Sequence, residues 1–131
     1  MIKILRSPQN PVLGPSQNLT WEKEAAFNPS VIKEKYLYHM LYRALSPTQS
    51  YLGINMQLST IGHALSRDGI NFSSHRQLIV PEYDWERFGC EDPRITGFDE
   101  KYYIFYTALS HYPFTPPGIR IGVAITTDFN K

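Results

Sequence analysis

Two acidic residues stand next to each other in the stretch GCEDPRIT, residues 89–96, and a proline and an arginine follow them. Adjacent carboxylates repel, so a narrow pocket that held both Glu91 and Asp92 would raise the pKa of one of them. A carboxylic acid with a raised pKa suits general acid catalysis near neutral pH. The alternative is a solvated acid where a strand begins at an Asp-Pro pair, and this stretch alone leaves both readings open. Arg94 adds a cation that would either pair with Glu91 or hold a substrate hydroxyl group.

The same pattern occurs earlier in the chain with an amide in place of the acid. Residues 21–45, WEKEAAFNPSVIKEKYLYHMLYRAL, align without a gap with residues 85–109, WERFGCEDPRITGFDEKYYIFYTAL, and seven of the 25 aligned positions are identical. Asn28 falls on Asp92, and each stands directly before a proline. The chain therefore contains an internal repeat, and Asn28 indicates that this position does not require a charge.

The repeat resumes at Ile61 and Ile121, with an offset four residues shorter, which places the difference in a connecting loop. We call residues 21–84 the first repeat and residues 85–131 the second repeat. The second repeat ends where the first continues toward an outer strand, so we expect it to be incomplete.

Each repeat is predicted to be an antiparallel meander of strands. Aromatic and β-branched residues dominate, and the segments YLYHMLYRAL and YYIFYTAL are apolar at nearly every position. Both faces of these middle strands should therefore be covered. A sheet that is covered on both faces and repeated along the chain is typical of a β-propeller blade. The sequence predicts an all-β fold with two propeller blades.

Equivalent strand starts in neighbouring blades line one central funnel, so Asn28 and Asp92 are expected to lie side by side. Two blades do not close a ring. We therefore expect residues 1–131 to form one partial propeller domain, with blade 1 at about 21–84 and an incomplete blade 2 at about 85–131. Further blades, or association of several copies into a homo-oligomer, would complete it.

Composition excludes several classes of partner. Thirteen basic and twelve acidic residues give a formal charge of +1 without a basic tract, which argues against nucleic-acid binding. No run approaches 18 apolar residues, so no membrane span is expected, and the apolar run at the start is too short for us to expect a signal peptide. One cysteine excludes an internal disulfide. We expect a cytoplasmic protein without a metal, with His39 and His63 packed inside strands.

Two further polar residues have competing structural and functional interpretations. Arg43 interrupts an otherwise apolar strand and needs a partner, which a sugar hydroxyl or a nearby acid would supply. Asp68 either shapes the Asp-Gly turn of SRDG or faces a substrate. The aromatic segment SHYPFTPPG, residues 110–118, forms either a substrate wall or a plain surface loop.

The stretches FNPSV, YLYHMLYRA, SRDGINF and above all GCEDPRIT resemble the mannoside phosphorylase family, glycoside hydrolase family 130. Its members are five-bladed β-propellers that cleave β-mannosides, usually with inorganic phosphate. The resemblance runs from about Pro11 to Lys131 and covers the first two blades of the family. It implies an enzyme of the glycosidase or glycosyltransferase type with an oligosaccharide substrate, phosphate as co-substrate and no other cofactor.

Carried over residue by residue, the resemblance makes Asp92 the proton donor and Asn28 and Arg43 the sugar-binding residues. Asp68 matches an acid on the substrate side. Glu91 and Arg94 are added as candidate substrate contacts. The residues that hold phosphate in the family have no match in this chain, so phosphorolysis and hydrolysis both stay open.

The leading hypothesis is inverting transfer of a β-mannosyl group from a β-1,4-manno-oligosaccharide or a mannosyl-glucose, with Asp92 as general acid and phosphate as nucleophile. An inverting hydrolase would need a second carboxylate to activate water, whereas a phosphorylase would not. One alternative is a propeller glycosidase that uses several separated carboxylates. Another is a carbohydrate-binding propeller fragment without catalysis.

Overall fold

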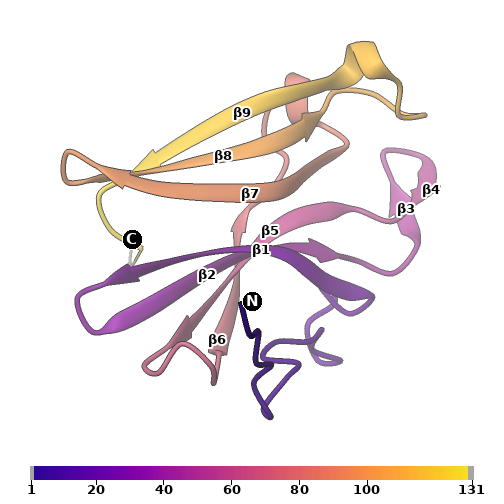
Figure 1. Cartoon of the computed structure of the whole chain (residues 1–131). Helices are drawn as coiled ribbons and strands as arrows, with labels where there is room; N and C mark the ends of the chain where they lie inside the picture. Colours follow the sequence, from indigo (N-terminus) through magenta and orange to yellow (C-terminus); the bar gives the residue numbers. More distant parts are fainter. Residues whose placement is uncertain (1, 130–131) are drawn as a thin grey trace.

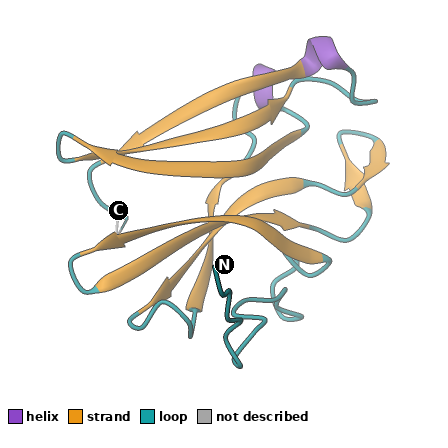
Figure 2. Cartoon of the chain, in the orientation of Figure 1, coloured by secondary structure: helices purple, strands orange, loops and turns teal. Residues whose placement is uncertain are grey.

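The computed structural model describes residues 2–129, and every regular element in this part of the chain is a strand or a single 3-10 turn. The strands form two larger sheets and one short hairpin. Figure 1 shows the two sheets stacked one above the other, and Figure 2 shows turns and loops joining the strands within each sheet. The predicted all-β fold is confirmed.

The first repeat forms a four-stranded antiparallel sheet with the strand order β1-β2-β5-β6. These strands are β1 (Ala25–Glu34), β2 (Leu37–Leu45), β5 (Ser59–Ser66) and β6 (Ser73–Ile79). The loop from β2 to β5, residues 46–58, carries a separate hairpin of β3 (Gln49–Tyr51) and β4 (Ile54–Met56).

The second repeat forms a three-stranded antiparallel sheet with the order β7-β8-β9. Its elements are η1 (Asp84–Glu86), β7 (Gly89–Phe98), β8 (Lys101–Leu109), η2 (Pro116–Gly118) and β9 (Ile119–Thr126). The loop from β8 to β9, residues 110–118, is four residues shorter than its counterpart at 46–58. The expected position of the length difference is thereby confirmed.

The main core lies between the two sheets. Leu41 and Ile61 of the first sheet are fully buried, as are Cys90 and Ala108 of the second. Each fully buried side chain the size of Leu or Ile stabilises the fold by about 1.5–3 kcal/mol. The opposite face of the first sheet is covered by a second cluster, in which Val12, Leu13, Trp21 and Phe72 pack on the buried residues.

The middle strands differ in how their faces are covered. Both faces of β2 are buried, as the sequence predicts, because the second sheet covers one and the N-terminal segment covers the other. For β8 one face is open within residues 2–129: Ile104 and Tyr106 are buried, but Phe105 is 45% exposed. Cover for this face by a further blade stays a prediction. No other sheet in residues 2–129 packs on that face of the second repeat, which leaves Phe105 at its surface.

Each repeat buries a glutamate against a tyrosine of its middle strand. In the first repeat Tyr42 donates its hydroxyl to Glu22 Oε2 over 2.5 Å. Gly62 lies opposite Tyr42 on β5, where any Cβ would overlap the tyrosine ring. Ser16 donates its backbone N–H to Glu22 Oε1 at 3.1 Å. The carboxylate thus ties the N-terminal segment to the sheet.

The second repeat contains the same arrangement at the equivalent positions. Tyr106 donates its hydroxyl to Glu86 Oε2 over 2.6 Å, and Gly122 leaves room for the ring. Glu82 donates its backbone N–H to Glu86 Oε1 at 3.0 Å, which ties the segment before η1 to the sheet. Burial and the neighbouring glutamate raise the pKa of the hydroxyl in both tyrosines. We call Glu22, Tyr42 and Gly62, with their counterparts Glu86, Tyr106 and Gly122, the Glu–Tyr–Gly clusters.

His39 and His63 are packed inside strands, as predicted, and are almost fully buried. Arg76 donates its Nε–H to His63 Nδ1 over 3.0 Å, so His63 carries its proton on Nε2, which lies 3.0 Å from His39 Nδ1. Burial and the Arg76 charge lower the pKa of His63 to about 3. The pair is therefore neutral at physiological pH.

Candidate active site

Asn28 and Asp92 are the fourth residues of β1 and β7, and each lies at a bulge where the pairing register shifts. Both have a φ angle of 50°, in the left-handed region that Asn and Asp tolerate better than most residues. A bulge also accommodates the following proline, because the ladder of hydrogen bonds is interrupted there. The two positions are equivalent, as predicted, but they do not start their strands, since each strand begins three residues earlier.

The two equivalent side chains are in direct contact. Asn28 donates its Nδ2–H to Asp92 Oδ1 over 2.7 Å. Arg43 Nη1 lies 3.7 Å from the same oxygen. Within residues 2–129, both contacts of this carboxyl group involve Oδ1. Oδ2 makes no hydrogen bond or ion pair within these residues.

Arg43 links the two sheets at this point. Its Nη2 lies 2.5 Å from Glu91 Oε1, its Nε donates to Ser59 Oγ at 3.1 Å, and its guanidinium lies 5.0 Å from the centre of the Phe27 ring. Charge-assisted hydrogen bonds and contact with an aromatic face satisfy a partly buried cation. These partners explain how an arginine is accommodated in an otherwise apolar strand.

Burial raises the pKa of Glu91. The Arg43 charge and a hydrogen bond with Ser59 oppose this shift, while Asp92 adds to it. Of the two interpretations of Arg94, pairing with Glu91 is not what the structure shows, because Glu91 pairs with Arg43. The bulge at Asp92 breaks the alternation of side chains along β7, which lets both acids approach the same arginine.

Arg94 and Asp68 lie outside this contact network. Arg94 donates from Nη1 to the Pro93 carbonyl over 2.7 Å and, with Asp92, lines a separate pocket of about 140 Å³. Asp68 lies two residues past Ser66, the far end of β5, and Ser66 is seven residues, or roughly 23 Å along the strand, from Ser59.

The Asp68 carboxylate is occupied in its own turn. It accepts hydrogen bonds from the backbone N–H groups of Ile70 and Asn71, from the Asn71 side chain and from Ser66 Oγ. These bonds lower the pKa of Asp68. The structure therefore brings Asn28, Arg43, Glu91 and Asp92 together and leaves Asp68 apart; its proposed contact with a substrate stays a prediction.

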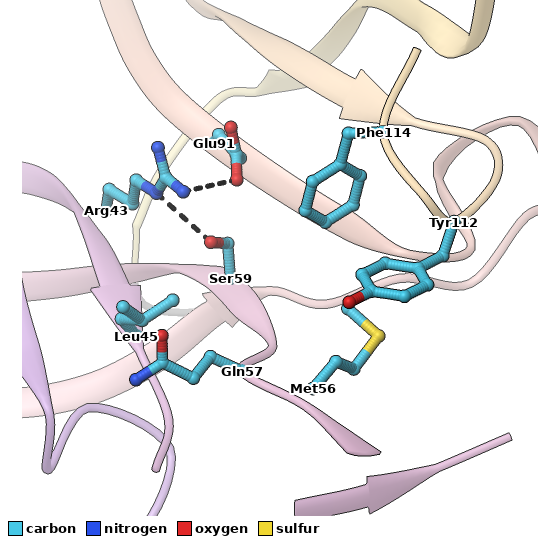
Figure 3. Close-up of a pocket in the computed structure, with 8 residues that line it drawn as sticks. All are labelled: Arg43, Leu45, Met56, Gln57, Ser59, Glu91, Tyr112 and Phe114. Carbon is cyan, nitrogen blue, oxygen red and sulfur yellow. Dashed lines mark hydrogen bonds and ion pairs between the residues drawn. The ribbon is translucent and has the colours of Figure 1, made fainter. Parts of the chain in front are cut away.

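A pocket of about 220 Å³ opens beside the Arg43–Glu91 ion pair. Figure 3 shows Arg43 and Glu91 on one side of it and Tyr112 and Phe114 on the other. The eight lining residues are Arg43, Leu45, Met56, Gln57, Ser59, Glu91, Tyr112 and Phe114. Both connecting loops contribute, since residues 46–58 supply Met56 and Gln57, and residues 110–118 supply the two aromatic side chains.

Sequence reasoning missed Ser59 and Gln57. Ser59 starts β5 and reaches Arg43 only because the register pairs Leu45 with Ser59, and no sequence pattern marks it. Gln57 belongs to a loop whose course depends on the β3–β4 hairpin. Residues 2–129 contain no cluster of three or more His, Cys, Asp or Glu side chains suited to a metal, and no helix long and apolar enough to span a membrane.

Comparisons with known proteins agree on the family. The family model for β-1,4-mannooligosaccharide phosphorylase, glycoside hydrolase family 130, matches residues 4–130. The chain is 40% identical over 117 residues to a β-1,2-mannobiose phosphorylase and 39% identical over 110 residues to a 1,2-β-oligomannan phosphorylase, both from Thermoanaerobacter sp. (strain X514). Each alignment covers 82% of this chain, but only 37% and 36% of the respective relative.

A solved structure gives the same result for the fold. The crystal structure of a glycosyl hydrolase from Bacteroides ovatus superimposes with a TM-score of 0.75 and 27% identity, covering 94% of this chain and 38% of that one. The structural neighbours are five-bladed propellers, so the two sheets are propeller blades. The chain spans little more than a third of the length of the proteins it matches. The sequence, the paired bulges and these matches together show that the chain belongs to glycoside hydrolase family 130.

Proposed function

We propose that the protein containing this chain is a phosphorylase of β-1,2-linked mannosides, with Asp92 as general acid and inorganic phosphate as nucleophile. The observation that carries the proposal is the contact of Asp92 with Asn28 and Arg43 at the paired bulges. Within residues 2–129, Glu91 and Asp92 are the carboxyl groups that meet at Arg43. Because the chain spans about a third of its relatives, the activity is proposed for the whole protein.

Asn28 has a defined part in this mechanism. Its amide donates to Asp92 Oδ1, so the proton of the acid form resides on Oδ2. A general acid is effective only when its proton points at the atom that receives it. The protonated oxygen would deliver its proton to the leaving group, directly or through a sugar hydroxyl, while phosphate attacks the opposite face of the mannosyl ring.

The state of Glu91 favours phosphate over water as the nucleophile. An inverting hydrolase needs a second carboxylate to activate water. Glu91 Oε1 lies 2.5 Å from Arg43 Nη2, so this oxygen is occupied by a cation and is not free to accept a proton from water. Phosphate needs no such base, and both curated relatives have names that include "phosphorylase".

The second part of the proposal concerns the glycosidic linkage of the substrate. The sequence led us to expect a β-1,4-manno-oligosaccharide or a mannosyl-glucose. The two curated relatives act, by name, on β-1,2-linked mannosides and share 40% and 39% identity with this chain. We therefore propose β-1,2-mannobiose as the first substrate to assay, with a β-1,4-linked mannobiose beside it.

Replacement of Asp92 by asparagine tests the assignment, because Asn28 already occupies the equivalent bulge. In the full-length protein, Asp92→Asn should lower phosphate-dependent cleavage of β-1,2-mannobiose by roughly 10²–10⁴-fold, the usual contribution of a general acid. Thermal stability and sugar affinity should change little. A mannoside with a very good leaving group should regain part of the lost rate. Asp84→Asn is the matched control, since Asp84 is exposed and lies away from this cluster.

Two outcomes would contradict the assignment. If the Asp92→Asn protein unfolds, the acid has a structural role. If it turns over natural mannosides at a near-normal rate, Asp92 is not the proton donor and Glu91 becomes the next residue to replace. Equal rates with and without phosphate in the wild-type protein would indicate hydrolysis.

A further inference from the structure

The pocket beside Arg43 has an aromatic side that the proposed proton transfer does not use. Tyr112 and Phe114 both line it, and their rings meet edge to face with centroids 5.3 Å apart. Both side chains are more than two-fifths exposed. Aromatic residues held at the surface beside a polar cluster are available to a ligand, unlike the aromatic residues of the core.

The two ends of the loop that carries these residues are hydrogen-bonded to each other. Ser110 donates its backbone N–H to the Gly118 carbonyl over 2.9 Å, and its hydroxyl donates to the same oxygen at 3.2 Å. His111 lies against Gly118 so closely that any side chain at position 118 would overlap its ring, and it also hydrogen-bonds Thr115. The two aromatic side chains therefore project from a short, internally bonded loop.

The facing side of the pocket is polar but has little net charge. Gln57 presents an amide, and the guanidinium of Arg43 is already paired with Glu91 at 2.5 Å. A phosphate in this pocket would meet the carboxylate of Glu91 as well as the cation. A neutral ligand with many hydroxyl groups meets no such repulsion and finds both donors and acceptors.

A pocket with one aromatic side and one polar side favours a ligand that has an apolar face and a polar edge. A pyranose ring has this shape, because its C–H groups gather on one face and its hydroxyl groups lie around the rim. The pocket, at about 220 Å³, holds the volume of about seven liquid water molecules, which is room for one such ring. Asn28 and Asp92 do not line it, so a ring bound here is a neighbour of the one held at Asp92.

We propose that this pocket binds the leaving sugar of the substrate, with Tyr112 and Phe114 against its apolar face and Gln57 and the Arg43–Glu91 pair at its hydroxyl groups. The inference rests on the proposed function, because it assigns the transferred mannosyl group to Asp92 and Asn28. It adds two residues that determine which sugar is accepted: Tyr112 and Phe114.

Kinetics in the synthetic direction test this, with mannose as acceptor and mannose 1-phosphate as donor. In the full-length protein, Phe114→Ala and Tyr112→Ala should each raise the KM for mannose by about tenfold, the loss expected when one aromatic contact is removed. The KM for mannose 1-phosphate should change less than twofold. Phe114→Tyr should retain the wild-type KM for mannose. Tyr36→Ala is the control, since Tyr36 is an exposed aromatic residue in the β1–β2 turn.

Binding without turnover separates this inference from the proposed function. Saturation-transfer NMR with mannose should show contact between the sugar ring and aromatic protons in the wild-type protein, and this contact should weaken in Phe114→Ala. If the sugar binds in this way but no mannoside is cleaved, the pocket assignment stands and the proposed function fails. If cleavage is normal and the aromatic variants keep the wild-type KM for mannose, the pocket assignment is overturned. A rise in the KM for mannose 1-phosphate equal to that for mannose would also overturn it.

Discussion

The two repeats share the residues that build a sheet and differ in the polar residues of the candidate site. Both bury a Glu–Tyr–Gly cluster, and both place a bulge before a proline at the fourth residue of the first strand. At that bulge the first repeat has Asn28 and the second has Asp92. Arg43 has Thr107 as its counterpart. Because the backbone is the same at both positions, the difference in chemistry comes from the side chains.

The repeats also differ in what covers their equivalent faces. Ile61 is fully buried, whereas its counterpart Ile121 is 81% exposed. The second sheet covers Ile61, and no sheet in residues 2–129 covers Ile121. The same position in the repeat is therefore core in one sheet and surface in the other, which makes the pair a direct probe of the environment.

The largest expected difference concerns this isoleucine pair. In a protein of residues 1–131, Ile61→Ala should lower the free energy of unfolding by about 2–5 kcal/mol, because it removes buried methyl groups and leaves a cavity. Ile121→Ala should change it by about 0.5 kcal/mol or less. Urea unfolding of both variants measures the difference. If Ile121→Ala is as damaging as Ile61→Ala in the full-length protein, another sheet covers that face there.

A smaller difference is expected between the two tyrosines of the Glu–Tyr–Gly clusters. Tyr42→Phe and Tyr106→Phe each remove a hydrogen bond to a buried carboxylate, which should destabilise the fold by about 1.5–3 kcal/mol. After the change, Glu22 Oε1 keeps His75 Nδ1 at 2.8 Å, whereas the side-chain partner left to Glu86 is the weakly donating thiol of Cys90, 3.6 Å from Oε2. The effect should therefore be somewhat larger for Tyr106→Phe, as measured by thermal unfolding. The reverse order would mean that His75 does not compensate for the lost hydroxyl group of Tyr42.

The smallest expected effect is the change in the free energy of unfolding per pH unit in acid. The first repeat should contribute most of it. His63 has Val123 as its counterpart. Because the pKa of His63 is about 3 in the folded protein and near 6.5 in the unfolded chain, the unfolded chain binds the proton more readily. The resulting stability is present above pH 6.5 and is lost as the pH falls toward 3, by at most about 1.4 kcal/mol per pH unit.

His63→Val, which copies the second repeat, should flatten this dependence between pH 6 and pH 4. His39, which contacts His63 and also has a lowered pKa, contributes in the same direction, while the raised pKa of Glu91 acts in the opposite one. Unfolding midpoints at several pH values measure the slope. An unchanged slope in His63→Val would assign the acid response to other groups.

The sequence predicted the parts of the fold that depend on local pattern. Apolar strands and the gapless repeat were enough to predict two antiparallel sheets and the equivalence of Asn28 with Asp92. The strand starts were wrong because a proline inside a strand is rare, and only the bulge makes it acceptable. The open face of β8 in residues 2–129 could not be predicted from the strand alone, because burial depends on what lies opposite, which Phe105 itself does not encode.

The candidate site was less predictable than the fold. Asp92 and Asn28 could be paired from the repeat, but the partner of Glu91 could not, because the alternation of side chains fails at the bulge. Arg43 was recognised as needing a partner, but its contacts with Glu91, Ser59 and Asp92 follow only from the β2–β5 register and the packing of the two sheets. Ser59 and Gln57 had no sequence signal at all.

The paired bulges have a consequence for how such a site arises from a duplication. Asparagine and aspartic acid differ by one group, an NH₂ in place of an oxygen. Two ionised acids at the bulges would repel each other, and two amides would leave no acid. One of each gives a donor that meets an acceptor, as in the 2.7 Å bond from Asn28 to Asp92. Once copied, the position can take on two roles: Asn28 holds Asp92 in place, and their hydrogen bond adds one polar contact between two blades that already share a core.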